Sequence, residues 1–369
     1  MSSVYIHVPF CKQRCAYCDF CSQTDLKKEK RYFLAIQKHI KSVADETFRV
    51  DSIFFGGGTP SVVDAKHIVE TIETIRQSFT VVPDVEITVE CNPESVTKEK
   101  ILAYKESGVN RISIGLQTIH DETLKKINRI HTYAEAIEAV KIVNGCGIEN
   151  INVDLLLGLP DETEDMFFKS VFAVSNLPIK HVSIYALEVY PNTPLGKAKG
   201  FKYMNEDEVA DAYYKAVELL KTLNFQRYEV SNFALDGYDC KHNTYYWKPH
   251  HYYGIGAGAS GFVGDVRYTN FDNVDQYIQA IESGASSILT SDVLTIEDKM
   301  YEAVMLGLRR EKGLNVSKFE KRFGKTIYEY CPKIHEYLAT GVLQKQNGRL
   351  FVRPDKIYVL NSILTELLS

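Results

Sequence analysis

The first 230 residues alternate between short apolar segments and segments with helical periodicity, and this alternation constrains the fold more than any other feature of the chain. Between the apolar segments, residues such as Ile68, Ile72 and Ile75 recur at helical spacing. Parallel strands need a long crossover connection, which a helix provides, so the alternation predicts a parallel sheet. Six or more such units predict an α/β fold that forms a partial (β/α)6 barrel related to the TIM barrel. The segments with strand character are 4–8, 52–55, 85–90, 111–116, 151–156, 181–187 and 227–230.

Polar residues and glycines gather where the expected strands end. The second strand runs into Gly56-Gly57-Gly58-Thr59-Pro60, and the third ends at Glu90-Cys91-Asn92-Pro93. The fourth ends at Gln117, and the fifth carries Asp154. In parallel barrels the active site is built on the carboxyl ends of the strands. We therefore expect the functional site on this rim.

The chain has 369 residues, too many for one small core, and its pattern changes twice. We expect a barrel domain over residues 1–231 and a connecting segment over 232–290 that is rich in aromatic, glycine and histidine residues. Within that segment, residues 254–260 contain too many glycines for a regular strand or helix. Residues 291–369 predict a small helical, winged-helix-like domain, in which 338–353 form a helix leading into a β-hairpin.

The charge balance and the apolar segments limit the class of protein. The net charge is −5, from 43 basic and 48 acidic residues, which argues against a nucleic-acid partner. The first residues lack the basic start and apolar core of a signal peptide. No segment approaches the roughly 20 apolar residues of a membrane helix. We expect a soluble, cytoplasmic protein that meets a membrane only peripherally, if its partner is bound there.

Four of the eight cysteines fall within residues 11–21, and three of them form the motif Cys11-x3-Cys15-x2-Cys18 on a loop after the first strand. In a reducing compartment such a group predicts metal or redox chemistry rather than disulfides. Soft thiolates suit iron–sulfur clusters and zinc. Three thiolates leave one iron of a cubane cluster without a protein ligand. A zinc site with Cys21 as fourth ligand is the alternative, although the second Cys-x2-Cys pair of many zinc sites is absent.

This motif, with Tyr17 before the third cysteine, resembles the signature of radical S-adenosylmethionine (AdoMet) proteins. The segment Gly56–Pro60 is similar to the one that binds the AdoMet amino group in that family. The resemblance implies a 4Fe–4S cluster on the three cysteines and AdoMet on the open iron. It also implies an electron donor such as flavodoxin or ferredoxin, whose electron cleaves the AdoMet sulfonium.

Further positions resemble the coproporphyrinogen-dehydrogenase and HemW branch of this superfamily, over nearly the whole chain. The resemblance implies that Glu90 and Asp154 accept hydrogen bonds from ribose hydroxyls and that Arg129 pairs with a carboxylate. Alternatively, each is a strand-end polar residue with a structural hydrogen bond. The residues expected to bind AdoMet are Tyr5, Tyr17, Gly57, Gly58, Thr59, Glu90, Gln117, Arg129 and Asp154.

Three features favour a resemblance to HemW-type heme chaperones over the oxygen-independent coproporphyrinogen III dehydrogenases, which oxidatively decarboxylate coproporphyrinogen III to protoporphyrinogen IX. The chain begins ten residues before Cys11, without the longer extension of the dehydrogenases. Phe20 stands where the dehydrogenases have a fourth cysteine. Residues 242–247 read His-Asn-Thr-Tyr-Tyr-Trp and match the HNxxYW motif of the chaperones.

The HNxxYW segment also has a direct chemical interpretation. Imidazole is a common axial ligand of heme iron, and aromatic side chains offer apolar faces to a porphyrin. We therefore expect His242 to bind heme iron, with Cys240, His250 and His251 as rival ligands. Alternatively, His242 and Trp247 only pack between domains or near AdoMet. The resemblance implies delivery of heme to client heme proteins, such as membrane-associated respiratory enzymes. It leaves open whether AdoMet is turned over.

Overall fold

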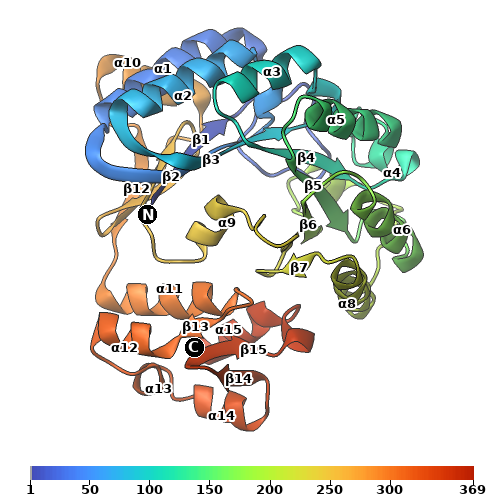
Figure 1. Ribbon diagram of the computed structural model, residues 1–369, viewed down its shortest axis with the longest axis vertical. Helices are drawn as coiled ribbons and strands as arrows, with labels where there is room; N and C mark the ends of the chain where they lie inside the picture. Colours follow the sequence, from blue (N-terminus) through green and yellow to red (C-terminus); the bar gives the residue numbers. More distant parts are fainter. Residues whose placement is uncertain (1) are drawn as a thin grey trace.

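The computed structural model describes residues 2–369, whose main element is one 12-stranded curved sheet (Figure 1). The first six strands pair in parallel and in chain order, which confirms the predicted parallel α/β sheet. They are β1 (Ser2–Val8), β2 (Asp45–Gly57), β3 (Phe79–Cys91), β4 (Arg111–Gln117), β5 (Asn150–Leu157) and β6 (His181–Ala186). Their central apolar side chains are fully buried, because both faces of the sheet are covered.

Helices between these strands cover the convex face of the sheet (Figure 1). Each buries one apolar stripe, and several begin at a capping side chain; in α5, Thr132 and Glu135 form a capping box. The helices between the strands are α1 (Glu29–Ser42), α2 (Ala65–Ser78), α3 (Lys98–Glu106), α4 (Asp121–Lys126), α5 (Tyr133–Gly145) and α6 (Glu164–Ser175); α7 (Pro194–Lys197) and α8 (Glu206–Thr222) follow β6.

The seventh expected strand, 227–230, differs from the prediction. Only β7 (Gln226–Arg227) forms, and it pairs antiparallel with β8 (Asn232–Ala234), which is itself antiparallel to β6. Glu229 and Val230 lie in the turn between the two strands. The parallel part of the sheet therefore ends at β6.

The glycine-rich segment forms strands, so the prediction that residues 254–260 hold no regular strand is wrong at both of its ends. β9 (Tyr252–Ile255) pairs in parallel with β1, and β10 (Ser260–Val263) follows as an antiparallel neighbour of β9. A Cβ on Gly254 would lie 1.8 Å from the Ser260 carbonyl oxygen. The glycine is required because these strands approach closely, not because the segment lacks structure.

Further strands and one helix continue this edge of the sheet. They are β11 (Val266–Asn270), α10 (Val274–Ser283) and β12 (Ile288–Val293). The sheet order is thus β12-β11-β10-β9-β1-β2-β3-β4-β5-β6-β8-β7. Residues 235–251 connect β8, beside β6, to β9, beside β1, and so cross between the two arms of the curved sheet. This crossing segment carries α9 (Lys241–Tyr246) on the concave side (Figure 1).

The chain after residue 293 is mainly helical and includes the expected hairpin before its last helix. β14 (Leu343–Gln346) and β15 (Arg349–Val352) pair antiparallel around Asn347 and Gly348, whose φ angles are 51° and 72°. Positive φ at both positions suits a two-residue hairpin turn. The remaining elements are α11 (Ile296–Leu308), β13 (Leu314–Asn315), α12 (Val316–Phe323), α13 (Ile327–Tyr330), α14 (Ile334–Ala339) and α15 (Leu360–Leu368). None of the helices in residues 2–369 is long and apolar enough to cross a membrane.

Candidate functional site

A cavity of about 660 Å³ runs from the carboxyl ends of the parallel strands toward α9. The residues that line the cavity come from distant parts of the sequence. They lie together because the strands are parallel, so their polar carboxyl ends meet at one edge of the sheet. Every residue expected to bind the cluster, AdoMet or heme lines this cavity. They are Cys11, Cys15, Cys18, Tyr5, Tyr17, Gly57, Gly58, Thr59, Glu90, Gln117, Arg129, Asp154 and His242.

The three cysteines of the motif lie on the loop after β1, at the outer end of the cavity. Burial raises the pKa of the Cys11 and Cys18 thiols. Two hydrogen bonds reach the sulfurs: Thr59 Oγ1 donates to Cys11 Sγ at 3.7 Å, and Arg129 Nη1 donates to Cys15 Sγ at 3.4 Å. Donors of this kind stabilise thiolates and tune iron–sulfur clusters. The donor set therefore fits a cluster with three protein ligands.

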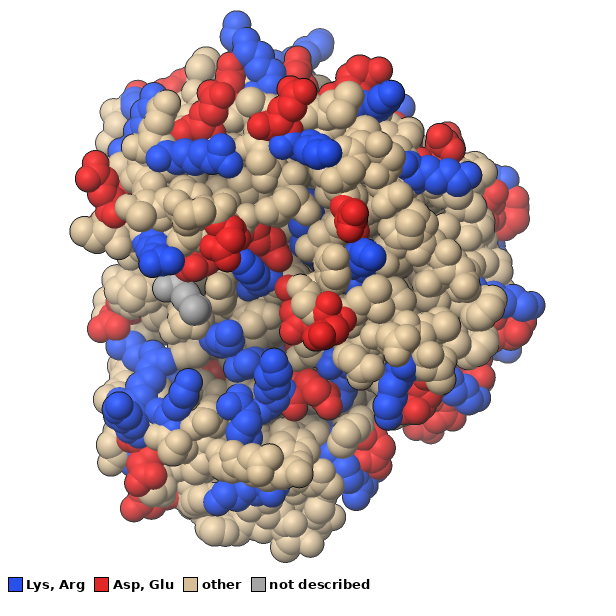
Figure 2. Space-filling view, in the orientation of Figure 1, with Lys and Arg blue, Asp and Glu red and all other residues tan. Residues whose placement is uncertain are grey.

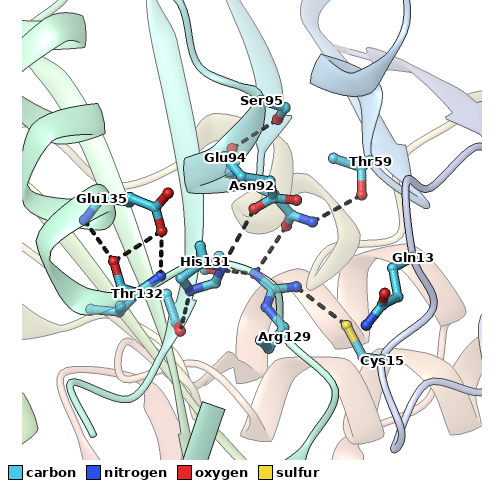
Figure 3. A network of polar contacts seen from close by, with 12 residues as sticks. Gln13, Cys15, Thr59, Asn92, Glu94, Ser95, Arg129, His131, Thr132 and Glu135 are labelled. Carbon is cyan, nitrogen blue, oxygen red and sulfur yellow. Dashed lines mark hydrogen bonds and ion pairs between the residues drawn. The ribbon is translucent and has the colours of Figure 1, made fainter. Parts of the chain in front are cut away.

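Arg129 links Cys15 to Asn92 and, through Asn92, to Thr59 in one chain of hydrogen bonds (Figure 3). Its Nη2 donates to Asn92 Oδ1 at 3.0 Å and to the Gly115 carbonyl oxygen. Asn92 Nδ2 donates in turn to Thr59 Oγ1 at 3.2 Å, and Thr59 donates to Cys11. Cys15 and Cys11 are thus held by the two ends of the same network. Sequence reasoning missed Asn92, although it directly follows Glu90-Cys91 at the end of β3.

Glu90 and Asp154 are acidic residues on the cavity wall. Glu90 Oε2 accepts a hydrogen bond from the Gly57 amide at 3.2 Å. Asp154 accepts from Ser113 Oγ at 3.0 Å and from Asn152 Nδ2 at 2.8 Å. Burial, with a contribution from Asp154, raises the pKa of Glu90 to about 8. The two carboxyl groups can accept hydrogen bonds from hydroxyls of a bound ligand.

The glycines after β2 place backbone, not side chain, against the cavity. Gly57 has φ 113°, and a Cβ there would lie 2.5 Å from the His7 ring. A Cβ on Gly58 would lie 2.7 Å from the Phe10 carbonyl oxygen. A side chain at either position would therefore collide with the protein, so only glycine can place its backbone here at the cavity wall.

Gln117 ends β4 in a strained conformation. Its φ is 76°, and the β4–β5 register shifts between Gly115 and Gln117. A bulge of this kind re-aims a side chain at the end of a strand, and non-glycine residues in this region are held by their surroundings. The bulge at the end of β4 thus places the Gln117 side chain at the cavity wall.

His242 lies at the inner end of the cavity, on α9. Its Nδ1 is 3.0 Å from Ser52 Oγ, and its ring stacks on Phe54 with centroids 4.8 Å apart. The Tyr246 ring lies edge-on to it at 4.8 Å. Burial and the charge of Arg111 lower the pKa of His242 to about 3, so the imidazole is neutral near pH 7. Its Nε2 is buried and has no hydrogen-bond partner among residues 2–369. A neutral imidazole with one nitrogen fixed and the other free has the donor chemistry of a metal ligand.

The rival heme ligands do not line this cavity. Cys240 is fully buried, and its Sγ lies 3.4 Å from Glu86 Oε1. His250 lies edge-on to Tyr245. His251 lies edge-on to Phe262.

Two other residues of the motifs also lie outside the cavity. Trp247 packs its indole under the Arg309 guanidinium, 5.5 Å away, so it contacts the C-terminal elements. Cys21 donates to the Asp272 carbonyl oxygen at 2.9 Å and lines a second cavity of about 300 Å³. Among residues 2–369, no group of three or more His, Cys, Asp and Glu side chains surrounds a single metal-ion position.

Further cavity residues gave no sequence signal of function, apart from one. Arg111 opens β4, and a charged residue at the start of a strand buried on both faces is unusual. The other missed lining residues include hydroxyl and amide groups on β4, β5 and β6: Ser113, Asn152, Ser183 and Tyr185.

Basic side chains gather where the C-terminal elements meet the barrel (Figure 2). Burial lowers the pKa of Lys248, and repulsion from neighbouring cations lowers it further; these are Arg310, Lys312, Lys318 and Arg349. A chain with net charge −5 therefore carries a local positive potential directly after α9.

Comparison with known proteins places these features in a family. Residues 5–173 match the radical SAM superfamily, and residues 294–355 match the HemN C-terminal domain. A heme chaperone HemW from Lactococcus lactis is 34% identical over 377 aligned positions, which cover 100% of this chain and 97% of the relative. A heme chaperone HemW from Bacillus subtilis is 32% identical, with 95% of both chains covered.

A solved structure shows the same fold. The radical SAM enzyme coproporphyrinogen III oxidase (HemN) from Escherichia coli superposes with a TM-score of 0.87, covering 99% of this chain and 89% of that one. At 21% identity this likeness concerns the fold alone, and it confirms the expected radical SAM architecture. The heme chaperone HemW from the same organism is 36% identical over 71% of this chain and 70% of its own. Because the identity to the Lactococcus lactis and Bacillus subtilis relatives extends along nearly whole chains, this protein belongs to the HemW family of the radical SAM superfamily.

Proposed function

We propose that the protein is a heme chaperone: it binds a 4Fe–4S cluster, AdoMet and heme, and delivers the heme to client heme proteins. The relatives that match the full chain carry the name heme chaperone HemW. The observation that carries the proposal here is the state of His242, a neutral imidazole with a fixed Nδ1 and an unpartnered Nε2 at the inner end of the cavity.

In this proposal Cys11, Cys15 and Cys18 hold the cluster and AdoMet occupies the cavity beside it. When bound, AdoMet supplies a sulfonium that one electron can cleave. Glu90 and Asp154 would accept hydrogen bonds from its hydroxyls, and Gly57 and Gly58 would present backbone groups. The electron would come from a small donor such as flavodoxin or ferredoxin.

Heme binding at His242 requires a movement of α9. The Nε2 atom is buried, with the Tyr246 ring edge-on to the imidazole. The helix has only six residues, and its start is anchored by Glu86, which accepts from the Lys241 and His242 amides at 3.0 and 3.1 Å. A short helix anchored at its start can shift at its end, and Tyr246 lies there. The client would accept heme after such a shift, at a membrane if the client is bound there.

Heme titration of the anaerobically reconstituted protein tests the proposal. The wild type should form a stable complex with a Soret band, and His242→Ala should lose most of the affinity. His250→Ala, a change of the same kind eight residues away and outside the cavity, is the matched control and should bind as the wild type does. Equal binding by wild type and His242→Ala would assign the iron to another residue.

The same preparation separates the chaperone from the dehydrogenase. Incubation with coproporphyrinogen III, AdoMet and a reductant should produce no protoporphyrinogen IX. Steady product formation would replace the proposed function with the oxidative decarboxylation.

A further inference from the structure

Arg111 is a buried cation without a direct partner. Its side chain is 1% exposed, yet it lines the inner end of the cavity. Its Nε has no hydrogen-bond partner, and no carboxylate of residues 2–369 lies within ion-pair distance of the guanidinium. Burial of such a group without hydrogen bonds costs several kcal/mol, so buried arginines are nearly always paired.

The nearby acidic groups are already committed to other donors. Glu86 accepts from Cys240 Sγ and from the amides of Lys241 and His242. Asp154 accepts from Ser113 and Asn152. Cys240, Glu86, Tyr228 and Asp154 still act on Arg111 through space and raise its pKa, although burial alone would lower it. The guanidinium therefore stays charged while its donors remain free.

Other unpartnered polar atoms lie beside Arg111. Thr88 on β3 is its register partner on β4, so the two side chains point to the same face of the sheet, and Thr88 Oγ1 is buried without a partner. His242 Nε2 is likewise free, and Arg111 is close enough to lower the pKa of His242. Arg111 on β4 and His242 on α9 thus present unsatisfied polar groups to one end of one cavity, and Thr88 lies beside Arg111 without lining the cavity. Buried polar atoms in native proteins have partners, so a missing partner at this position indicates a ligand.

We propose that Arg111 is a binding site for a ligand carboxylate at the inner end of the cavity. A guanidinium matches a carboxylate with two parallel hydrogen bonds, and Arg111 lines the cavity in which such a group could bind. The inference rests on the proposed function, because the ligands considered are the two that it names. Both carry the required group: AdoMet has one carboxylate, and heme has two propionates.

Arg111→Met tests the site because it separates a ligand-binding arginine from a structural one. Removing an uncompensated buried charge should stabilise the empty protein and raise its thermal unfolding midpoint by about 2 °C or more. The same change should weaken the carboxylate ligand about 10–100-fold, because charged hydrogen bonds are lost. Lys100→Met is the matched control: Lys100 Nζ donates to the Ser61 and Val63 carbonyl oxygens at 2.6 and 3.0 Å, outside the cavity. That control should lower the midpoint and leave both affinities unchanged.

Separate titrations identify which carboxylate binds. AdoMet is titrated into the cluster-loaded protein, and hemin and its dimethyl ester are titrated in parallel. If Arg111 holds a propionate, Arg111→Met reduces hemin affinity to that of the ester, while AdoMet binding is unchanged. If it holds the AdoMet carboxylate, only AdoMet binding falls.

Arg111→Lys provides a second variant in case the methionine variant misfolds. It keeps the positive charge but not the two parallel N–H donors of the guanidinium, so it should bind the carboxylate with intermediate affinity. The inference is overturned if either variant binds AdoMet and hemin as the wild type does, or if Arg111→Met lowers the midpoint as Lys100→Met does. A wild type that binds neither ligand overturns the proposed function as well, which distinguishes the two failures.

Discussion

Two arginines face the same cavity from opposite ends, and they are in opposite states. Arg129, at the outer end, donates to Cys15, Asn92 and Gly115. Arg111, at the inner end, is more deeply buried and donates no hydrogen bond to any of residues 2–369. Arg111 is the first residue of β4, and Arg129 donates to the carbonyl of Gly115 in the same strand. Both side chains are charged.

The difference indicates what each end was built for. At the outer end Arg129, Asn92 and Thr59 are joined by direct hydrogen bonds, although Arg129 Nε has no partner among residues 2–369, so Cys11 and Cys15 are held in place before any cofactor binds. At the inner end, polar groups of β4 and α9 have no partner among residues 2–369. A cavity of this kind has one preorganised end and one end completed by its ligand.

The largest expected effect concerns Arg129. Arg129→Ala removes the hydrogen bonds that Arg129 donates to Asn92 Oδ1 and the Gly115 carbonyl, and it should reduce the free energy of unfolding by about 3–4 kcal/mol. Urea denaturation of the cluster-free protein measures this. Arg129→Lys keeps the charge and should lose less. A neutral or stabilising Arg129→Ala would remove the contrast with Arg111.

Glu90 gives the next largest effect, and the effect depends on pH. The pKa of Glu90 is raised from 4.5 to about 8, so the folded state favours the protonated form. Its contribution to stability is complete below pH 4.5 and is lost as the pH rises through about 8. Glu90→Gln should therefore be more stable than the wild type by about 2–3 kcal/mol at pH 6.5, and by less than about 1 kcal/mol at pH 5. Denaturation curves at the two pH values test this, and a gain that does not depend on pH would contradict it.

Ser52 tests the inner end through the orientation of His242. Ser52→Ala removes the hydrogen bond to Nδ1 and should weaken heme binding about tenfold, because partners of metal-ligating histidines typically contribute 10–100-fold. A shift of the Soret maximum should accompany the loss. Ser52→Thr keeps the hydroxyl and should restore both the affinity and the spectrum, whereas a failure to restore them would assign Ser52 a packing role.

The smallest expected effect is at Thr59. Thr59→Val removes the hydrogen bond to Cys11 Sγ, and fewer hydrogen bonds to sulfur stabilise the reduced cluster less. Loss of one weak hydrogen bond should lower the reduction potential by about 20–40 mV. Redox titration measures it, with Thr59→Ser as the control that keeps the hydroxyl. An unchanged potential would show that the outer network holds the cysteines without tuning the cluster.

Much of the fold followed from the sequence because it depends on local patterns. The six parallel strands were predicted from apolar segments that alternate with helices, and the hairpin at Asn347-Gly348 from its turn residues. Residues 252–263 were not recognised as strands. Their glycines permit close approach to a neighbouring strand, but without that neighbour in view they indicate only irregular structure.

The candidate site divides in a similar way. The cysteine motif and the strand-end residues were found because family patterns and strand ends are visible in sequence. Asn92 and Arg111 were missed because their importance lies in partners distant along the chain, or in the absence of any partner. Whether a buried charge is satisfied is a property of the folded molecule, so no spacing pattern reports it.

The segment 235–251 crosses between the two arms of the sheet and limits how far apart they can move. It runs from β8 on one arm to β9 on the other, so its contour length limits how far the two arms can separate. Shortening it by a few residues would draw the arms together, whereas lengthening it would let the curved sheet relax open. The separation of the two arms is therefore adjustable by insertions and deletions in one loop, without any change to β1 or to the cysteine motif that follows it.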